Sequence, residues 1–304
     1  MIDSKEDHQT SDNNIGGWYP EELKKYDMEG VDSLASYSIS NLKHFVALTC
    51  CLGGGEESAS LKWPRNPELK ELAPILQKVK EGKDIVDIAA GFGEPSAGML
   101  LELSQRFRLK DTKYLVTDID DYGEVADEVD LLGGVLLHDP KPLWVDKPDD
   151  YYFNWSLSNL NRNNWQDVRD RVLRRYGNKW DATKPSFYDN IEEVLGKDKV
   201  GLFILRHPEI GDARQPELTP IFTDIINNLL EEAVNKKIPV FITTSNNELS
   251  RKNIGTLIDS FFEKEGTNKD LWKIISMEDL EGVTSHSGPR ALDSKIWATF
   301  PKTI

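Results

Sequence analysis

Cysteine is nearly absent from this chain of 304 residues, which contains only Cys50 and Cys51. Because the two are adjacent within an apolar stretch, they cannot link separate parts of the chain. We expect buried thiols in a reducing compartment. A disulfide framework of the kind that supports small secreted proteins is therefore excluded.

Long hydrophobic runs are also missing. No window approaches the roughly 20 uncharged apolar residues of a membrane-spanning helix. The first residues, MIDSKEDHQTSDNN, lack the basic start and apolar core of a secretion signal. We therefore expect a soluble protein, cytoplasmic in its location, with no membrane partner.

Basic residues are scarce relative to acidic ones. Lysine and arginine number 37 against 52 acids, and the formal net charge is -15. Such a field repels phosphate backbones, which disfavours nucleic acids as partners and favours small or cationic substrates. Methylation of RNA would rest only on a run of arginines, namely Arg162, Arg169, Arg171, Arg174 and Arg175. The sequence does not indicate an oligomeric state.

Several catalytic motifs are absent too. The five histidines have no short ligand spacing with cysteine or with one another, so no metal is predicted, although His138 and Asp139 beside Asp120 and Asp121 leave a weaker metal alternative. GEPSAG at residues 93–98 is not a hydrolase elbow, and there is no phosphate-binding G-x-x-x-x-G-K-[ST] loop.

The chain does contain alternating strand-length and helix-length segments from Lys83 onward. Alternation of this kind predicts an α/β fold, a doubly wound, mostly parallel seven-stranded sheet with an antiparallel last strand. The expected strands are residues 84–89, 113–119, 134–139, 200–206, 239–245, 272–277 and 294–300, and the expected helices are 96–107, 124–132, 219–236 and 249–264.

Three regions are predicted. Residues 1–17 form a flexible tail, 18–80 an N-terminal helical region, and 81–304 a Rossmann-like cofactor-binding domain. An insert at 141–199 interrupts this domain with four of the eight tryptophans and a helix-patterned run, NWQDVRDRVLRRYGNKW. It is interpreted as a lid over the substrate, or alternatively as an auxiliary helical layer.

The segment IVDIAAGFGEPSAGML, residues 85–100, starts as a strand and ends as a helix. Asp87 lies near the strand's carboxyl end, Gly91 and Gly93 lie in the turn, and Glu94 precedes the helix. Glycine lets a ligand approach bare backbone at the edge where α/β folds bind nucleotides, but such a turn can also be a structural corner.

Asp118 ends the next expected strand, 31 residues after Asp87. A carboxylate at this position can accept hydrogen bonds from both hydroxyls of a ribose. Acids at two neighbouring strand ends repel a pyrophosphate but attract a nucleoside with a cationic tail.

At these residues the chain resembles the class I S-adenosylmethionine-dependent methyltransferases. D-I-A-A-G-F-G at 87–93 matches their first motif, although Ala89 replaces its first glycine; Asp118 matches the ribose acid, and Asp139 the acid of the third strand that meets adenine. The resemblance implies S-adenosylmethionine as cofactor. The cofactor-binding residues that it implies are Asp87, Ala89, Ala90, Gly91, Gly93, Glu94, Asp118, Ile119 and Asp139.

In this fold the acceptor is held over the fourth strand, where VGLFILRHPEIG places Arg206, His207 and Glu209. His207 is a candidate proton acceptor, and Arg206 a candidate partner for a substrate carboxylate. Alternatively, His207 belongs to a rigid turn and Arg206 pairs with Glu209 or an internal acid.

The sequence therefore predicts an S-adenosylmethionine-dependent methyltransferase acting on a small-molecule substrate. Two alternatives stay open: a non-catalytic protein-binding domain of the same fold, and a transferase of the cofactor's aminoalkyl group.

Overall fold

The computed structural model describes residues 67–90, 100, 103–104, 107–121, 165–206, 208–211, 213, 215–243, 248–264, 269–277 and 296–302. The predicted tail at 1–17 and most of the predicted helical region at 18–80 lie outside these residues. So do residues 141–164 of the predicted insert.

Seven strands of the described chain form one sheet in the order β3-β2-β1-β4-β5-β7-β6. The strands are β1 (Asp84–Ile88), β2 (Tyr114–Asp118), β3 (Val172–Tyr176), β4 (Val200–Arg206), β5 (Val240–Thr243), β6 (Trp272–Met277) and β7 (Ile296–Pro301). β7 runs antiparallel to both of its neighbours, β5 and β6, whereas the other adjacent strands are parallel. This arrangement confirms the predicted fold class, including the antiparallel last strand.

The strand order reverses at β1. The chain runs outward from β1 through β2 to β3, and then returns to place β4 on the other side of β1. Connections that leave β1 and β4 in opposite directions open a crevice at their carboxyl ends, where open α/β sheets bind ligands. The topology therefore selects the ends of β1 and β4 as the candidate site.

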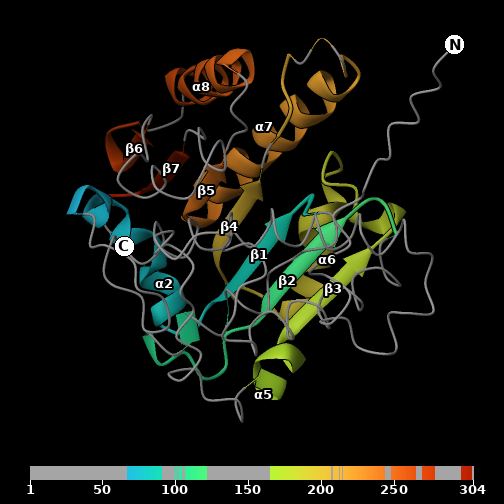
Figure 1. Cartoon of the computed structure of the whole chain (residues 1–304), viewed down its shortest axis with the longest axis vertical. Coiled ribbons are helices and arrows are strands. Elements are labelled where there is room, and N and C mark those ends of the chain that lie inside the picture. The colour runs from blue at the N-terminus through green and yellow to red at the C-terminus, as the bar shows by residue number, and fades with distance from the viewer. Residues whose placement is uncertain are drawn as a thin grey trace, which may run out of the picture.

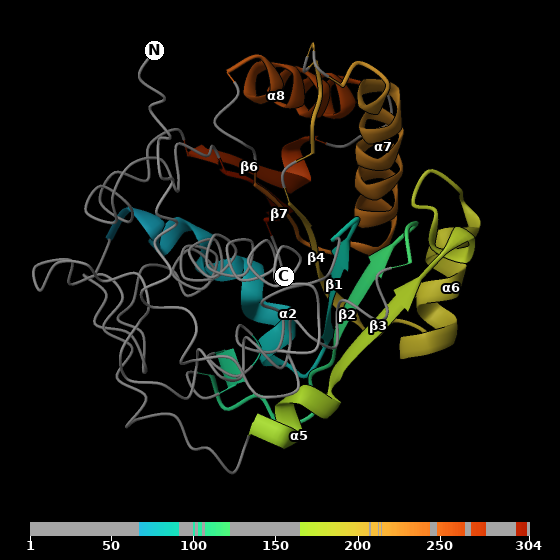
Figure 2. The same ribbon diagram turned by 45° about the vertical axis from the view of Figure 1, so that its right-hand side comes forward.

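Both faces of the sheet are covered by helices (Figures 1 and 2). One face packs against α6 (Ser186–Leu195), α7 (Leu218–Lys236) and α8 (Glu248–Glu263). On the other face, the 3-10 helix η2 (Pro67–Leu76) and α2 (Gln77–Lys80) contact β4. Since strand residues alternate between faces, two-sided covering explains the nearly continuous apolar runs of the central strands.

The two long helices occur where periodicity predicts them, at 219–236 and 249–264. Gly255 of α8 lies so close to β7 that an added Cβ would stand 2.6 Å from Cζ2 of Trp297. The absence of a side chain therefore lets this helix pack directly on the sheet. Among the described helices, none combines the length and the apolar character needed to cross a bilayer.

The third strand differs from its prediction. The structure forms β3 from VLRRY at 172–176, inside the segment predicted as a helical insert, whereas residues 134–139 lie outside the described residues. Only Trp165–Asp170 of that segment is the helix α5. Pairing with β2, from Tyr114↔Val172 to Asp118↔Tyr176, outweighs the helical pattern of the sequence.

The C-terminal part of the predicted insert contributes to the body of the domain. Residues 172–176 belong to the sheet, and α6 contributes Phe187, Tyr188 and Ile191 to the main hydrophobic core. The interpretation of the insert as a lid stays a prediction.

Candidate functional site

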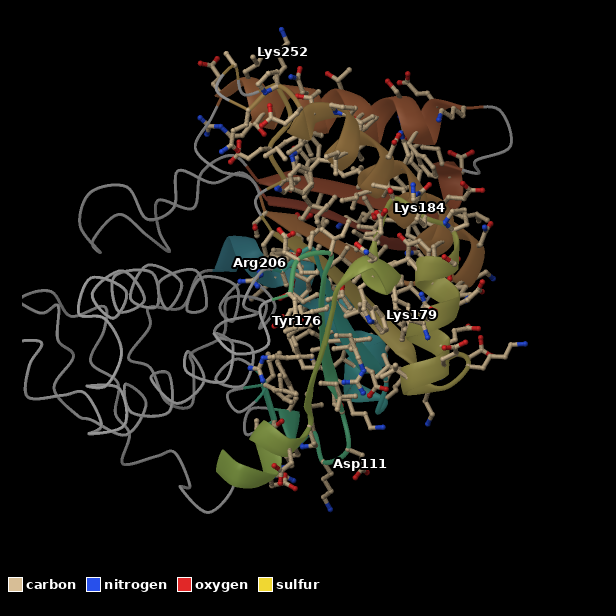
Figure 3. All side chains as sticks on the ribbon, turned by 90° about the vertical axis from the view of Figure 1, so that its right-hand side faces the viewer. Asp111, Tyr176, Lys179, Lys184, Arg206 and Lys252 are labelled. Carbon is tan, nitrogen blue, oxygen red and sulfur yellow. The ribbon has the colours of Figure 1, made fainter. Side chains whose placement is uncertain are left out.

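The carboxyl ends of the parallel strands lie together along one side of the sheet, here called the carboxyl edge, and they bring several predicted site residues close together. β1 ends before Ala89 and Ala90, β2 ends at Asp118, and β4 ends at Arg206. Figure 3 shows Arg206 and Tyr176 near this edge, whereas Asp111 lies toward the opposite one. Residues far apart in sequence are thus assembled by the shared direction of the strands.

Asp87 occupies the interior of this edge. Its side chain has only 1% of its surface exposed, and it faces the Arg206 guanidinium, with Nη2 3.0 Å from Oδ2 and Nε 3.3 Å from Oδ1. Tyr114 donates its hydroxyl to Oδ2 at 2.9 Å. Strand register explains this arrangement, because Asp87 pairs with Ile204 and Tyr114 pairs with Ile85, which puts all three polar side chains on one face.

The Asp87–Arg206 pair also holds the turn after β1. Arg206 Nη2 donates to the carbonyl of Ala90 at 3.1 Å, and the Ala90 N–H donates to the carbonyl of Thr117 at 3.0 Å. Burial raises the pKa of the Asp87 carboxyl, while the Arg206 guanidinium and the Tyr114 hydroxyl act to lower it. The pair therefore joins β4 to the turn where the resemblance places the cofactor.

This geometry is the structural alternative considered for Arg206, in which it pairs with an internal acid. Its side chain is 10% exposed and its donors point to Asp87 and Ala90. Little of the guanidinium surface is left for a substrate carboxylate. A direct role of Arg206 toward an acceptor stays a prediction, as does direct contact between Asp87 and the cofactor.

Ala89 adopts a left-handed backbone conformation with φ of 49°. This is the position where the resembled family has glycine, and glycine adopts such angles without the steric cost that a Cβ adds. For alanine the conformation costs about 1 kcal/mol or more. The turn after β1 thus keeps the backbone shape of a glycine turn in spite of its alanine.

Asp118 and Ile119 form the outer part of the edge. Asp118 is 9% exposed, and its Oδ1 accepts the N–H of Asp120 at 3.1 Å. An ionised carboxylate is an acceptor with two oxygens, so this side chain is of the type that the predicted contact with ribose hydroxyls requires. Ile119 has 47% of its surface exposed, which provides an apolar surface beside the acid.

The residue at the end of the third strand is Tyr176. It pairs in register with Asp118, and the N–H of Gly177 donates to the Asp118 carbonyl at 3.1 Å. β3 is not the predicted strand, and it ends in Tyr176 rather than in an acid, whereas Asp139 lies outside the described residues and its role stays a prediction. Tyr176 was missed, although a strand-length VLRRY before a glycine is a signal that could have revealed it.

The loop after β4 is fixed by the helices that follow it. Ser250 of α8 donates its hydroxyl to the carbonyl of Pro208 at 3.1 Å and accepts the N–H of Ile210 at 3.2 Å. The N–H of Gly211 donates to Thr219 Oγ1 at 2.8 Å. The loop that carries the predicted acceptor residues is therefore rigidly positioned, and Glu209 is half-buried within it.

Several predicted site residues cannot be placed. Gly91, Gly93, Glu94 and His207 lie outside the described residues, and their roles stay predictions. Within the described ranges no group of three or more histidine, cysteine, aspartate or glutamate side chains could hold a metal ion.

Part of the arginine run that would support RNA binding lies in and next to β3, where some of its side chains contact the protein itself. Arg171 donates to the Thr112 carbonyl at 3.0 Å and lies 3.3 Å from Asp167, and Nε and Nη2 of Arg174 are buried. Arg175 is exposed. These positions follow from β3 being a strand, and they reduce the basic surface that the sequence suggests.

No protein-family model matches the chain, and no curated protein matches it. Solved structures similar to it include a human methyltransferase 10 domain containing protein, with 10% identity, a TM-score of 0.36, and coverage of 85% of this chain and 96% of that chain. A protein from Listeria monocytogenes, described as a class I S-adenosylmethionine-dependent methyltransferase, has 13% identity, a TM-score of 0.39, and coverage of 77% and 57%.

The N-terminal domain of human METTL16, solved in complex with SAH, has 12% identity, a TM-score of 0.37, and coverage of 84% of this chain and 81% of that chain. At identities and TM-scores this low, the similarity assigns no function to this chain.

Proposed function

We propose that the chain binds S-adenosylmethionine at the carboxyl ends of β1 and β2 and transfers its methyl group to a small-molecule acceptor. The observation that supports this most is the meeting of three features at the point where the strand order reverses. These are the left-handed turn at Ala89, the carboxylate of Asp118, and the exposed side chain of Ile119.

The described residues fit such a cofactor. A carboxylate such as that of Asp118, at the end of β2, is the kind of group that accepts hydrogen bonds from ribose hydroxyls, and Ile119 offers an apolar surface for the adenine ring. Tyr176, on the adjacent strand end, is the expected third contact of the adenosine. When bound, the cofactor supplies a methyl group already activated on a sulfonium.

Protein residues then have to align and desolvate the acceptor rather than activate it strongly. The loop after β4 suits this task, since Ser250, Thr219 and Asn253 hold its backbone. Asn253 donates its side-chain amide to the Ile210 carbonyl at 3.2 Å. Arg206 acts behind this loop as a positioning residue through its bonds to Asp87 and Ala90.

Isothermal titration with S-adenosylhomocysteine tests the cofactor assignment. We expect binding, and we expect Asp118→Asn to weaken it about tenfold or more, since one charged acceptor of the ribose is lost. Asp111→Asn, an exposed acid at the opposite edge of the sheet, is the matched control and should bind normally. Absence of binding by the unmodified protein would remove the proposal.

The acceptor class is tested with methyl-labelled cofactor and an extract from the source cells. Label recovered in the fraction that passes a small-pore filter supports a small-molecule acceptor. Label retained with protein or RNA contradicts it. The mass of the product separates methyl transfer from aminoalkyl transfer.

A second candidate is a non-catalytic domain of the same fold. The enclosure of Asp87 by Arg206 and Tyr114 favours it, because the acid of the first motif is occupied within the protein. Binding of the cofactor without any labelled product in the same extract would support this candidate over the enzyme.

A further inference from the structure

A second candidate site lies where the parallel strands begin, at the start of β4. This side of the sheet is called the amino edge. A partly open cavity of about 130 Å³ lies there between the start of β4, α6, α7 and the end of α2. Its apolar wall consists of Ile191, Val200, Phe203 and Ile238. Engineered cavities of ~150 Å³ hold a benzene molecule, so this partly open space is suitable for one small organic molecule, part of which can extend into solvent.

Two lysines line one part of this cavity. Lys78 Nζ donates to the Lys237 carbonyl at 2.6 Å, and Lys83 Nζ donates to the Asp198 carbonyl at 2.6 Å. Among the described residues, no carboxylate lies within ion-pair distance of either ammonium. Burial, followed by the nearby charge of Lys83, lowers the pKa of Lys78. These lysines therefore form a positive region that would gain from an anionic group.

Gly201 of β4 explains why the lysines lie here. A Cβ on Gly201 would stand 2.5 Å from the Lys83 Cβ and 3.1 Å from the Lys78 Cβ. Only glycine permits this close approach of both lysines to the strand. The position of the positive region is thus built into β4 rather than left to flexible surface side chains.

Two glutamates line another part of the cavity and share one lysine. Lys236 Nζ lies 2.6 Å from Glu192 and 2.7 Å from Glu232. Two carboxylates with one ammonium leave an excess of one negative charge, so this region would gain from a ligand ammonium. Asp198, whose side chain is exposed, also lines the cavity.

Tyr188 supplies an independent sign of a ligand. It lines the cavity, it is 8% exposed, and its buried hydroxyl has no hydrogen-bond partner within the described part of the chain. Burial, and then the charge of Glu232, raise the pKa of this hydroxyl, so it is neutral and able to donate or accept. A buried hydroxyl without a partner is costly, and a ligand would remove that cost.

We propose that this cavity binds a small free amino acid with an apolar side chain. Its carboxylate would meet Lys78 and Lys83, its ammonium would meet Glu192 and Glu232, and its side chain would lie on the apolar wall. The Tyr188 hydroxyl would complete its hydrogen bonding.

This site is separate from the cofactor site. Val200 and Arg206 are the two ends of β4, which at ~3.3 Å per residue places the two sites about 20 Å apart. The amino-acid site therefore does not depend on the proposed methyl transfer, and each can fail without the other.

Calorimetry with single ligands tests the proposal. We expect at least one of the L-amino acids alanine, valine, leucine, isoleucine, methionine and phenylalanine to bind. For leucine, 3-methylbutylamine and 4-methylpentanoate are matched compounds that each lack one charged group, and both should bind at least tenfold more weakly. Failure of all six amino acids, or equal binding of either single-charge compound, would overturn the proposal.

Variants identify the site. Lys78→Gln, Lys83→Gln and Tyr188→Phe should each weaken binding about tenfold. Lys179→Gln and Lys184→Gln, exposed lysines outside the cavity (Figure 3), should bind as the unmodified protein does. Tyr188→Phe is the most informative, because a purely structural hydroxyl without a partner can be removed without lowering the melting temperature. Unchanged affinity in this variant would contradict the proposal.

Discussion

The two ends of the parallel strands differ in how their charged side chains are paired and buried. At the carboxyl edge, Asp87 and Arg206 neutralise one another directly and leave 1% and 10% of their side chains exposed. At the amino ends of the strands, and within the described part of the chain, Lys78 and Lys83 donate to backbone carbonyls, while Glu192 and Glu232 share Lys236.

This difference shows how burial selects between structural and binding roles. A charge removed from water is very costly unless it is paired, so a matched pair such as Asp87–Arg206 supports the fold. Around the cavity the charges do not balance in the same way, since Lys78 and Lys83 donate to carbonyls and two glutamates share one lysine. Arg206, a catalytic candidate in the sequence, thus has a structural role in the described part of the chain.

The largest effect should come from breaking the pair at the carboxyl edge. Arg206→Met would leave the Asp87 carboxylate buried beside the Tyr114 hydroxyl without its guanidinium, and should cost about 3–5 kcal/mol of unfolding free energy, measured by urea denaturation. The double variant Asp87→Asn, Arg206→Met should recover part of this loss, since no charge is then buried. A loss below about 1 kcal/mol in the single variant would show that the pair is not structural.

Gly201→Ala probes the amino edge. The added Cβ would meet the Lys83 Cβ at 2.5 Å, so the backbone has to shift, and we expect a loss of about 1–3 kcal/mol. Because Lys83 provides the nearest atom, the double variant with Lys83→Gly should be less destabilised than additivity predicts. Thermal and urea unfolding measure both, and an unchanged stability in Gly201→Ala would contradict the close approach.

Ala89→Gly sharpens the account of the carboxyl edge. Glycine adopts the left-handed φ of 49° without the Cβ penalty, so stability should rise by about 1 kcal/mol. Ala213→Gly, at an exposed position that does not have positive φ, is the control and should lower stability slightly. Equal losses in both variants would refute the strained turn.

Glu192→Gln should have the smallest effect. The hydrogen bond from Lys236 lowers the pKa of Glu192 in the folded protein. The ion pair therefore stabilises the fold at pH values above the ordinary pKa of a glutamate, and this stabilisation is lost as the pH falls through the lowered pKa of Glu192. Because the pair is partly exposed, we expect a loss below about 1 kcal/mol at neutral pH. The difference should disappear in acid, and a difference that persists there would have another origin.

Much of the fold was predictable, because six of the seven strands and both long helices have clear periodicity. The exception is instructive. VLRRY lies in a segment with helical spacing and forms β3 at the edge of the sheet, so only its pairing with β2 reveals it. The described third strand consequently ends in Tyr176, and the role of Asp139 stays a prediction.

The site was less predictable. Asp118 and the turn at Ala89 are evident from the sequence, since each follows directly from a strand end. The partner of Asp87 is not evident, because Arg206 lies 119 residues away in the sequence. From the sequence, pairing with an internal acid was one of several possible roles for Arg206. Lys78 and Lys83 at the amino edge belong to no recognisable sequence motif, so the sequence did not predict a site there.

By itself the sequence determined the α/β class, the strand and helix periods, and the acids at the first two strand ends, because these depend on neighbouring residues. The tertiary structure alone decided which strand stands third, which charge neutralises Asp87, and where charges surround a cavity. The physical reason is that burial and pairing are set by contacts between distant segments, such as Lys78 with Lys237 across 159 residues. The local structural preferences of the residues do not predict such long-range contacts.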